Sequence, residues 1–352
     1  MIRRLCGLLC LALIAMFPLA PLTAQPVQPA QRIVAVGDLH GDFDAWRQVA
    51  LNARLIDQRN HWAGGSSILV QLGDIVDRGP DSLKIISHLM KLQKEAAHAG
   101  GRVVVLVGNH EAMNMTGDLR YVTAGEYAAF ATADSAPLRD RTYAANKAAI
   151  VAGYRARTPA MSDDAIRAAW LALTPLGKLE HQAAWSPRGP LGRWTLANQA
   201  IAKIGDSIFV HGGISVAYST TPYQMINRRV TAALKAGDVS ETSILYDPFG
   251  PLWYRGLITR KEDGEQSSAF PASYPSIDQE LAAALQTNGA RHLVIAHTPR
   301  LAGIVISNGG QLARIDTGMS RYYGGKLSYL EIVGGQLMPR NFDRSPPTPA
   351  VR

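Results

Sequence analysis

The sequence predicts an α/β fold in which two mixed β-sheets pack as a sandwich flanked by helices, with a helical insertion. Early in the chain, three apolar runs typical of buried strands recur about 35 residues apart, the spacing of strand–helix–strand units. Late in the chain, short apolar segments joined by glycine-containing turns indicate β-hairpins. An alanine-rich segment with helix signals lies between the two groups.

The first three strands are expected within residues 32–36, 67–72 and 102–107. Each run is almost wholly apolar, as expected of central strands that are covered on both faces. Right-handed crossovers place the loops after successive parallel strands at one edge of the sheet. The polar residues of these loops, Asp38, Asp74 and Asn109, are therefore expected to lie close together.

The alanine-rich segment, from about residue 125 to about residue 187, is expected to be a helical insertion. Prolines at 137, 159 and 175 are expected to break it into separate helices. Ser162, followed by two aspartates, is a favourable helix start. The expected helical runs are Gly125–Ala133, Arg141–Arg157 and Asp163–Leu173.

The remaining elements belong to the second half of the fold. Helices are expected at Tyr223–Ala236 and Ile277–Asn288, and a strand at Leu293–His297. Two hairpins follow and indicate a second sheet packed on the first. Their strands are Gly303–Ser307 with Gln311–Asp316, and Leu327–Val333 with Gln336–Pro339.

The two ends of the chain are expected to lie outside this domain. Residues 1–24 have a basic start, an apolar run and a small residue at 24, the pattern of a secretory signal peptide. The apolar run is short for a membrane span, so we expect no retained span. The domain is expected at 25–340, and residues 341–352 are expected to form a disordered tail.

Composition agrees with export. Both cysteines, Cys6 and Cys10, lie in the predicted signal, so the mature chain needs no disulfide in a periplasmic or secreted setting. The formal net charge of +8 is dispersed rather than gathered in a lysine- and arginine-rich block. It indicates attraction for anionic ligands and does not support a nucleic-acid patch.

Five short polar motifs lie in the chain, most of them directly after an apolar run, and they contain the candidate catalytic residues. They contribute oxygen and nitrogen donors, which suit hard or borderline divalent metal ions. Each motif alone is compatible with a turn or a helix cap, but all five in this order indicate a two-metal site. The candidate ligands are Asp38, His40, Asp74, Asn109, His211 and His297.

These motifs resemble those of the calcineurin-like metallophosphoesterases of the phosphoprotein phosphatase family. The resemblance rests on Gly37–Gly41, Gly73–Gly79, Gly108–Glu111, His211–Gly213 and His297, and extends from about residue 32 to about residue 333. The runs Asn109–Met115 and Gly117–Val122 resemble the Shewanella-like branch in particular. The resemblance implies the metallophosphoesterase fold, with the same two-sheet architecture.

The resemblance also implies how the metals are held. Asp38 and His40 bind one ion, Asp74 bridges both, and Asn109, His211 and His297 complete the second site. Mn²⁺ is the expected metal, with Fe and Zn as alternatives that these ligand types allow. A hydroxide between the metals then attacks phosphorus directly.

Other residues are expected to handle the substrate. His110 is the expected general acid, held by Asp77 through its other ring nitrogen. Arg78, Arg255 and Asn109 are expected to bind the phosphate, since a guanidinium pairs with two phosphoryl oxygens. Because the insertion lies between the loops of Asn109 and His211, a substrate-shaping cap is favoured over a peripheral decoration.

The expected function is a secreted phosphatase that hydrolyses phosphomonoesters on phosphoproteins. The serine/threonine branch has a Ser-Ala-Pro-Asn-Tyr run, where this chain reads Ile315–Gly325 with Tyr322 and Tyr323. Phosphotyrosine is therefore favoured over phosphoserine and phosphothreonine. Two alternatives stay open: a hydrolase of small phosphoesters or dinucleoside polyphosphates, and a catalytically inactive metal-containing binding protein. The sequence leaves the oligomeric state undetermined.

Overall fold

The three early apolar runs form the centre of a five-stranded sheet. In the computed structural model, which describes residues 31–260 and 273–345, β1 (Ile33–Val36), β2 (Ile68–Gln71) and β3 (Arg102–Val105) are parallel. The late hairpin of β9 (Leu327–Val333) and β10 (Gln336–Phe342) adds two antiparallel strands beside β1. The strand order is β10-β9-β1-β2-β3.

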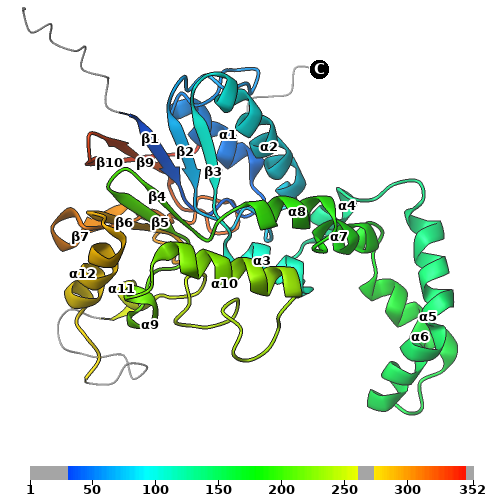
Figure 1. Ribbon diagram of the computed structural model, residues 1–352. Coiled ribbons are helices and arrows are strands. Elements are labelled where there is room, and N and C mark those ends of the chain that lie inside the picture. The colour runs from blue at the N-terminus through cyan, green and yellow to red at the C-terminus, as the bar shows by residue number, and fades with distance from the viewer. Residues whose placement is uncertain (1–30, 261–272, 346–352) are drawn as a thin grey trace, which may run out of the picture. The chain divides into compact units, whose positions relative to one another are not determined.

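A second mixed sheet of five strands has the order β4-β5-β6-β8-β7 (Figure 1). Here β5, β6 and β8 are parallel, whereas β4 and β7 are antiparallel edge strands. The predicted hairpin at residues 303–316 is confirmed, with a 3₁₀ turn at Asn308–Gly310. The strands are β4 (Ile201–Ile204), β5 (Ser207–Val210), β6 (His292–Ile295), β7 (Val305–Ser307) and β8 (Leu312–Arg314).

Alternating residues of each strand explain why the two sheets pack face to face. Ala35 and Val70 of the first sheet share one buried cluster with Phe209 and Val294 of the second. Their neighbours in the strands belong to a larger cluster that includes the helices α1 (Phe43–Asn52), α2 (Ser82–His98), α10 (Tyr223–Ala236) and α12 (Ile277–Asn288). Both faces of both sheets are thus covered, which confirms the predicted sandwich.

The helical segment between the sheets is longer than predicted. It continues past residue 187, because Pro190 occupies the first turn of α8, where a missing N–H costs no hydrogen bond. Pro137 does not separate two helices, since it lies in the first turn of α5. The helices are α3 (Asn109–Thr116), α4 (Ala124–Ala128), α5 (Ser135–Arg157), α6 (Asp163–Leu173), α7 (Lys178–Trp185) and α8 (Pro190–Ala197).

Two of these helices, α5 and α6, pack mainly on each other and lie to one side of the sheets in Figure 1. Of their residues, only Ser135, Tyr143 and Ile166 are buried. Two very short helices, α9 (Val216–Ser219) and α11 (Gly256–Thr259), occupy loops after β5.

The predicted tail begins too early in the chain. Asn341 and Phe342 still pair with β9, and the Ser345 amide donates to Gln48 Oε1. The predicted signal at 1–24 and the rest of the tail lie outside the described residues. Within residues 31–260 and 273–345, we find no helix with the length and apolar character needed to cross a bilayer.

Candidate metal centre and active site

The site residues gather where strands end, in loops with an unusual backbone. Eight non-glycine residues of the described chain have a positive φ, and five of them belong to this site. Side chains other than glycine rarely adopt this conformation, which costs about 1–3 kcal/mol per residue. The five are His40 (44°), Asp74 (52°), Asp77 (69°), Arg78 (69°) and His297 (66°).

One group of donors forms around His211. Ligand atoms of Asp74, His211 and His297 all lie within 4.8 Å of one another. Asn109 Oδ1 is 2.9 Å from His211 Nε2. The other ring nitrogen, His211 Nδ1, donates to the Leu72 carbonyl oxygen at 2.8 Å, which orients Nε2 toward the group. A histidine that ligates a metal is commonly fixed by such a bond.

A second group forms around His40. Ligand atoms of His40, Asp74 and His110 lie within 4.8 Å of one another, so Asp74 is common to both groups. His40 Nδ1 donates to the Val76 carbonyl oxygen at 3.0 Å, leaving Nε2 directed at the carboxylates. Asp38 does not belong to this group under the 4.8 Å criterion. Its Oδ2 nevertheless lies 3.8 Å from His40 Nε2.

The charges of the site fit a pair of divalent cations. Asp38, Asp74 and Asp316 are buried together. Burial, Asp316 and Asp74 raise the pKa of Asp38 well above its usual value, and burial raises that of Asp316 to about 6. His297 Nε2 is buried without a hydrogen-bond partner, although its ring contacts His211. Bound cations would offset this concentration of negative charge.

His110 and Asp77, the expected acid pair, lie next to the candidate metal ligands. His110 Nδ1 lies 2.5 Å from Asp77 Oδ2, and Asn114 Nδ2 donates to Asp77 Oδ1 at 3.0 Å. Burial lowers the pKa of His110, but the charges of Asp74 and Asp77 and the hydrogen bond to Asp77 outweigh burial and raise it. This shift favours the protonated imidazole, the form that a general acid requires.

Both predicted phosphate-binding arginines line a small cavity of about 110 Å³ over these groups. Arg255 Nη1 donates to the His297 carbonyl oxygen and to Thr298 Oγ1, at 2.8 and 2.9 Å. The Arg78 guanidinium carbon lies 4.7, 5.0 and 5.2 Å from the ring centres of Tyr121, Tyr322 and Tyr323. Asn109 also lines this cavity, consistent with its predicted position near a bound phosphate.

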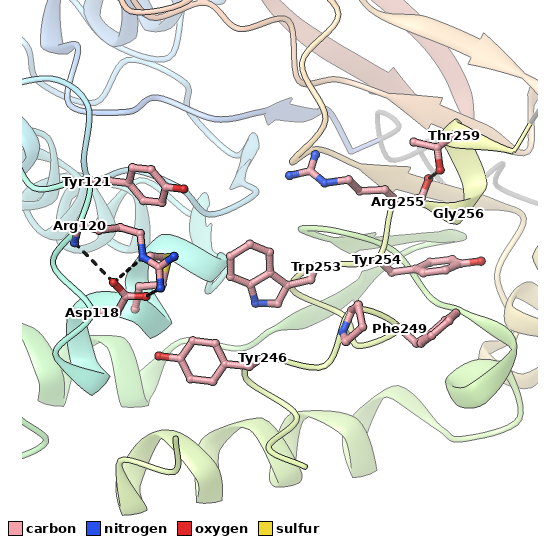
Figure 2. Close-up of a pocket in the computed structure, with 12 residues that line it drawn as sticks. Asp118, Arg120, Tyr121, Tyr246, Phe249, Trp253, Tyr254, Arg255, Gly256 and Thr259 are labelled. Carbon is pink, nitrogen blue, oxygen red and sulfur yellow. Dashed lines mark hydrogen bonds and ion pairs between the residues drawn. The ribbon is translucent and has the colours of Figure 1, made fainter. Parts of the chain in front are cut away.

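A larger cavity of about 690 Å³ adjoins the small one, and the two share Tyr121, Trp253 and Arg255. Figure 2 shows the indole of Trp253 at its centre, between the loop of Tyr121 and the loop that carries Tyr246 and Phe249. Most of its lining is apolar or aromatic. The ion pair of Asp118 and Arg120 lies at one side.

Neither cavity is lined by a residue of α5 or α6. The predicted insertion cap is therefore not supported for these two helices, because they pack on each other rather than over the site. The loop of Tyr121, which immediately precedes the insertion, lines both cavities, as does the segment of Trp253 and Arg255.

The sequence analysis missed two buried carboxylates of the site. Glu111 accepts hydrogen bonds from the amides of Gly108, Asp74 and Ile75, at 2.8, 2.9 and 2.8 Å, and so holds two ligand loops together. Asp316, which ends the predicted strand Gln311–Asp316 and follows β8 by two residues, faces Asp38. The available signals were the place of Glu111 in the Gly108–Glu111 motif and the place of Asp316 at the end of a predicted strand. Three further histidines, His88, His181 and His292, are also buried.

Comparison with known proteins agrees with this geometry. Residues 31–301 match the family of calcineurin-like phosphoesterases. The chain is 32% identical over 296 residues to Shewanella-like protein phosphatase 2 of Arabidopsis thaliana, covering 83% of this chain and 72% of the relative. It is 27% identical to Shewanella-like protein phosphatase 1 of Plasmodium berghei, covering 86% and 71%.

A solved structure, a cold-active protein-tyrosine phosphatase of a psychrophilic Shewanella species, is 25% identical with a TM-score of 0.63, covering 90% of this chain and 79% of that one. The donor groups, the acid pair and these similarities agree on metal-dependent hydrolysis of phosphoesters. The chain therefore belongs to the calcineurin-like phosphoesterase family, in its Shewanella-like protein phosphatase branch.

Proposed function

We propose that this phosphatase acts on phosphoproteins after export, and that it favours phosphotyrosine over phosphoserine and phosphothreonine. The observation that carries the proposal is the group of three tyrosine side chains that contact the Arg78 guanidinium. Tyr121, Tyr322 and Tyr323 give the phosphate-binding arginine aromatic walls, against which a phenyl ring can pack. The adjoining cavity around Trp253 offers room for the residues that flank a phosphorylated side chain.

The similar Shewanella structure is that of a protein-tyrosine phosphatase, which supports the same preference. Against it, the small cavity of about 110 Å³ accepts any phosphoryl group, so hydrolysis of small phosphoesters or dinucleoside polyphosphates is the competing function. The intact pair of His110 and Asp77 argues against a binding protein without catalysis, since binding alone needs no general acid.

Three groups of residues have separate tasks in the proposed reaction: metal binding, phosphate orientation and proton transfer. When bound by Asp38, His40, Asp74, Asn109, His211 and His297, two divalent ions supply an activated water and offset charge on the phosphoryl group. Arg78 and Arg255 orient the phosphoryl oxygens. His110 passes the proton on Nε2 to the leaving-group oxygen, while Nδ1 stays bonded to Asp77.

A peptide screen tests the substrate. The mature protein, reconstituted with Mn²⁺, is given peptides of one sequence that carry phosphotyrosine, phosphoserine or phosphothreonine, and kcat/KM is compared. A higher value for phosphotyrosine is expected. The test variant is Tyr322→Leu, which removes one exposed aromatic wall without touching the metal ligands and should reduce the preference.

Equal kcat/KM on all three peptides would contradict the phosphotyrosine preference. Faster hydrolysis of a dinucleoside polyphosphate than of every peptide would instead favour the competing function. Export and metal identity need separate measurements. N-terminal sequencing of the protein from an exporting host should find cleavage after residue 24, and elemental analysis of that protein should find manganese.

A further inference from the structure

The run Gly117–Val122 supplies the Tyr121 wall beside Arg78, and it also lies against the catalytic groups. Gly117 ends α3 in the left-handed conformation, with φ of 85°, so the chain turns back over that helix. The Tyr121 ring then lies 5.1 Å from the ring of His110 and 4.7 Å from the guanidinium of Arg78. This loop leads directly into the short helix α4.

The same segment holds the backbone of the turn that carries Asp77 and Arg78. The Arg78 amide donates to the Tyr121 carbonyl oxygen at 3.1 Å. The Asp77 amide donates to Glu126 Oε1 at 3.0 Å. Both residues of the turn have φ of 69°, so these two bonds fix a conformation that the turn would not favour alone.

The Glu126 side chain faces the Asp77 amide and not the solvent. It is 2% exposed. Its Oε2 accepts the Thr123 amide at 2.9 Å in a capping box, and its Oε1 also accepts the Ser82 hydroxyl. Burial, followed by the charge of Asp77, raises its pKa to about 7. A capping box alone needs no buried carboxylate, because an exposed glutamate can make the same two bonds.

The approach of α4 to the turn depends on a glycine. A Cβ at Gly125 would lie 2.5 Å from Pro80 Cβ, so only glycine allows α4 to reach this position. Glu126 thus contacts Asp77, Tyr121 contacts Arg78, and Gly125 lies against Pro80. Asp77 in turn holds His110 through Oδ2 and Asn114 through Oδ1.

We infer that Glu126 is a positioning residue for catalysis, which acts through the Asp77 amide to place both the general acid and the phosphate-binding arginine. Its substitution should impair proton donation and phosphate binding together, while the metal ligands remain in place. The inference concerns the phosphoester hydrolysis itself and holds for any phosphomonoester substrate.

Four variants test this role in the metal-reconstituted protein. Glu126→Ala removes the acceptor, and Glu126→Asp withdraws it by one methylene. Glu126→Gln keeps one oxygen that can still accept the Asp77 amide. Thr123→Ala is the matched control, because it removes the N-cap of the same helix and leaves the contact between Glu126 and Asp77 unchanged.

The expected pattern differs from that of a loosened helix. Glu126→Ala should lower kcat on an alkyl phosphate by about 10²-fold, the scale expected when catalytic groups are misplaced by about 1 Å. The defect should be smaller on an aryl phosphate, whose leaving group needs less protonation, and KM should rise on both. Glu126→Asp should show a weaker form of the same pattern, Glu126→Gln should recover most activity, and Thr123→Ala should change only thermal stability.

Two further measurements separate positioning from folding. Amide hydrogen exchange of a peptide that covers residues 77–79 should accelerate in Glu126→Ala and not in Thr123→Ala. In a His110→Asn background, Glu126→Ala should have little further effect on kcat, because the acid it positions is already absent.

Several results would overturn the inference: equal kcat losses on alkyl and aryl phosphates, full additivity with His110→Asn, or unchanged exchange at residues 77–79. If Glu126→Ala does not fold, Glu126→Asp decides the question by the same criteria.

Discussion

The hydrogen bond between Asp77 and His110 makes a quantitative prediction about pH. Asp77→Asn replaces a carboxylate whose two oxygens both accept, one from His110 Nδ1 and the other from Asn114 Nδ2. The asparagine amide nitrogen must face one of these two donors. The variant therefore loses the negative charge and also one of the two hydrogen bonds.

The size of the effect follows from that geometry. A hydrogen bond to a charged group contributes about 1.5–3 kcal/mol, and one pKa unit corresponds to about 1.4 kcal/mol, so the pKa of His110 should fall by about 1–2 units. In the native protein this pKa is raised, and kcat is expected to decline as pH rises through it. In Asp77→Asn the decline should begin about 1–2 pH units lower.

The assay is kcat against pH on an alkyl phosphate with saturating Mn²⁺. Asn114→Ala is the control, because it leaves the carboxylate beside His110 and removes only a neighbouring donor. Its alkaline limb should not move to lower pH. If Asp77→Asn shows the alkaline limb at the native position, Asp77 does not maintain the protonated imidazole.

Four other predictions follow from the same site. Asp74→Asn should lose metal and activity together, because the carboxylate is common to both donor groups; two retained metals per chain by mass spectrometry, with normal turnover, would refute the bridging role. His110→Asn should keep both metals and slow turnover by about 10²–10⁴-fold, less on aryl phosphates; an equal loss on all leaving groups would indicate a different role. Replacing residues 140–172 of α5 and α6 by a Gly/Ser linker should leave the ratio of kcat/KM for phosphotyrosine and phosphoserine peptides unchanged, since neither helix lines the cavities, and a large fall would restore the cap hypothesis. The pKa of Glu126 is about 7 in the folded protein and 4.5 in the unfolded chain, so the unfolded state loses its proton first as pH rises. The free energy of unfolding should therefore fall by about 3 kcal/mol between pH 4.5 and 7. Chemical denaturation of Glu126→Gln should show a weaker dependence of this free energy on pH.

The sequence predicts most of the two-sheet architecture and many of the candidate site residues, because both depend largely on local sequence. Strand runs, crossover spacing and loop residues are local properties, so the convergence of Asp38, Asp74 and Asn109 can be inferred without coordinates. The late hairpins are similarly local, since turn residues and alternating side chains lie within one short segment.

What the sequence could not predict depends on contacts between distant segments. Glu126 has the sequence pattern of an ordinary helix cap, and only the fold brings its carboxylate to the Asp77 amide. Asp316 is one residue of a hairpin strand until the sandwich places it beside Asp38. The position of α5 and α6 follows from packing of their side chains, which the order of segments along the chain does not determine.

The left-handed conformations of Asp77 and Arg78 have a consequence for how such an enzyme can change. Glycine would relieve about 1–3 kcal/mol at either position, so selection for thermal stability alone favours replacing the residues proposed to hold the acid and the phosphate. Directed evolution toward heat resistance is therefore best confined to positions outside this turn. In natural lineages that lose the activity, Asp77 and Arg78 should be among the first positions to be replaced by glycine.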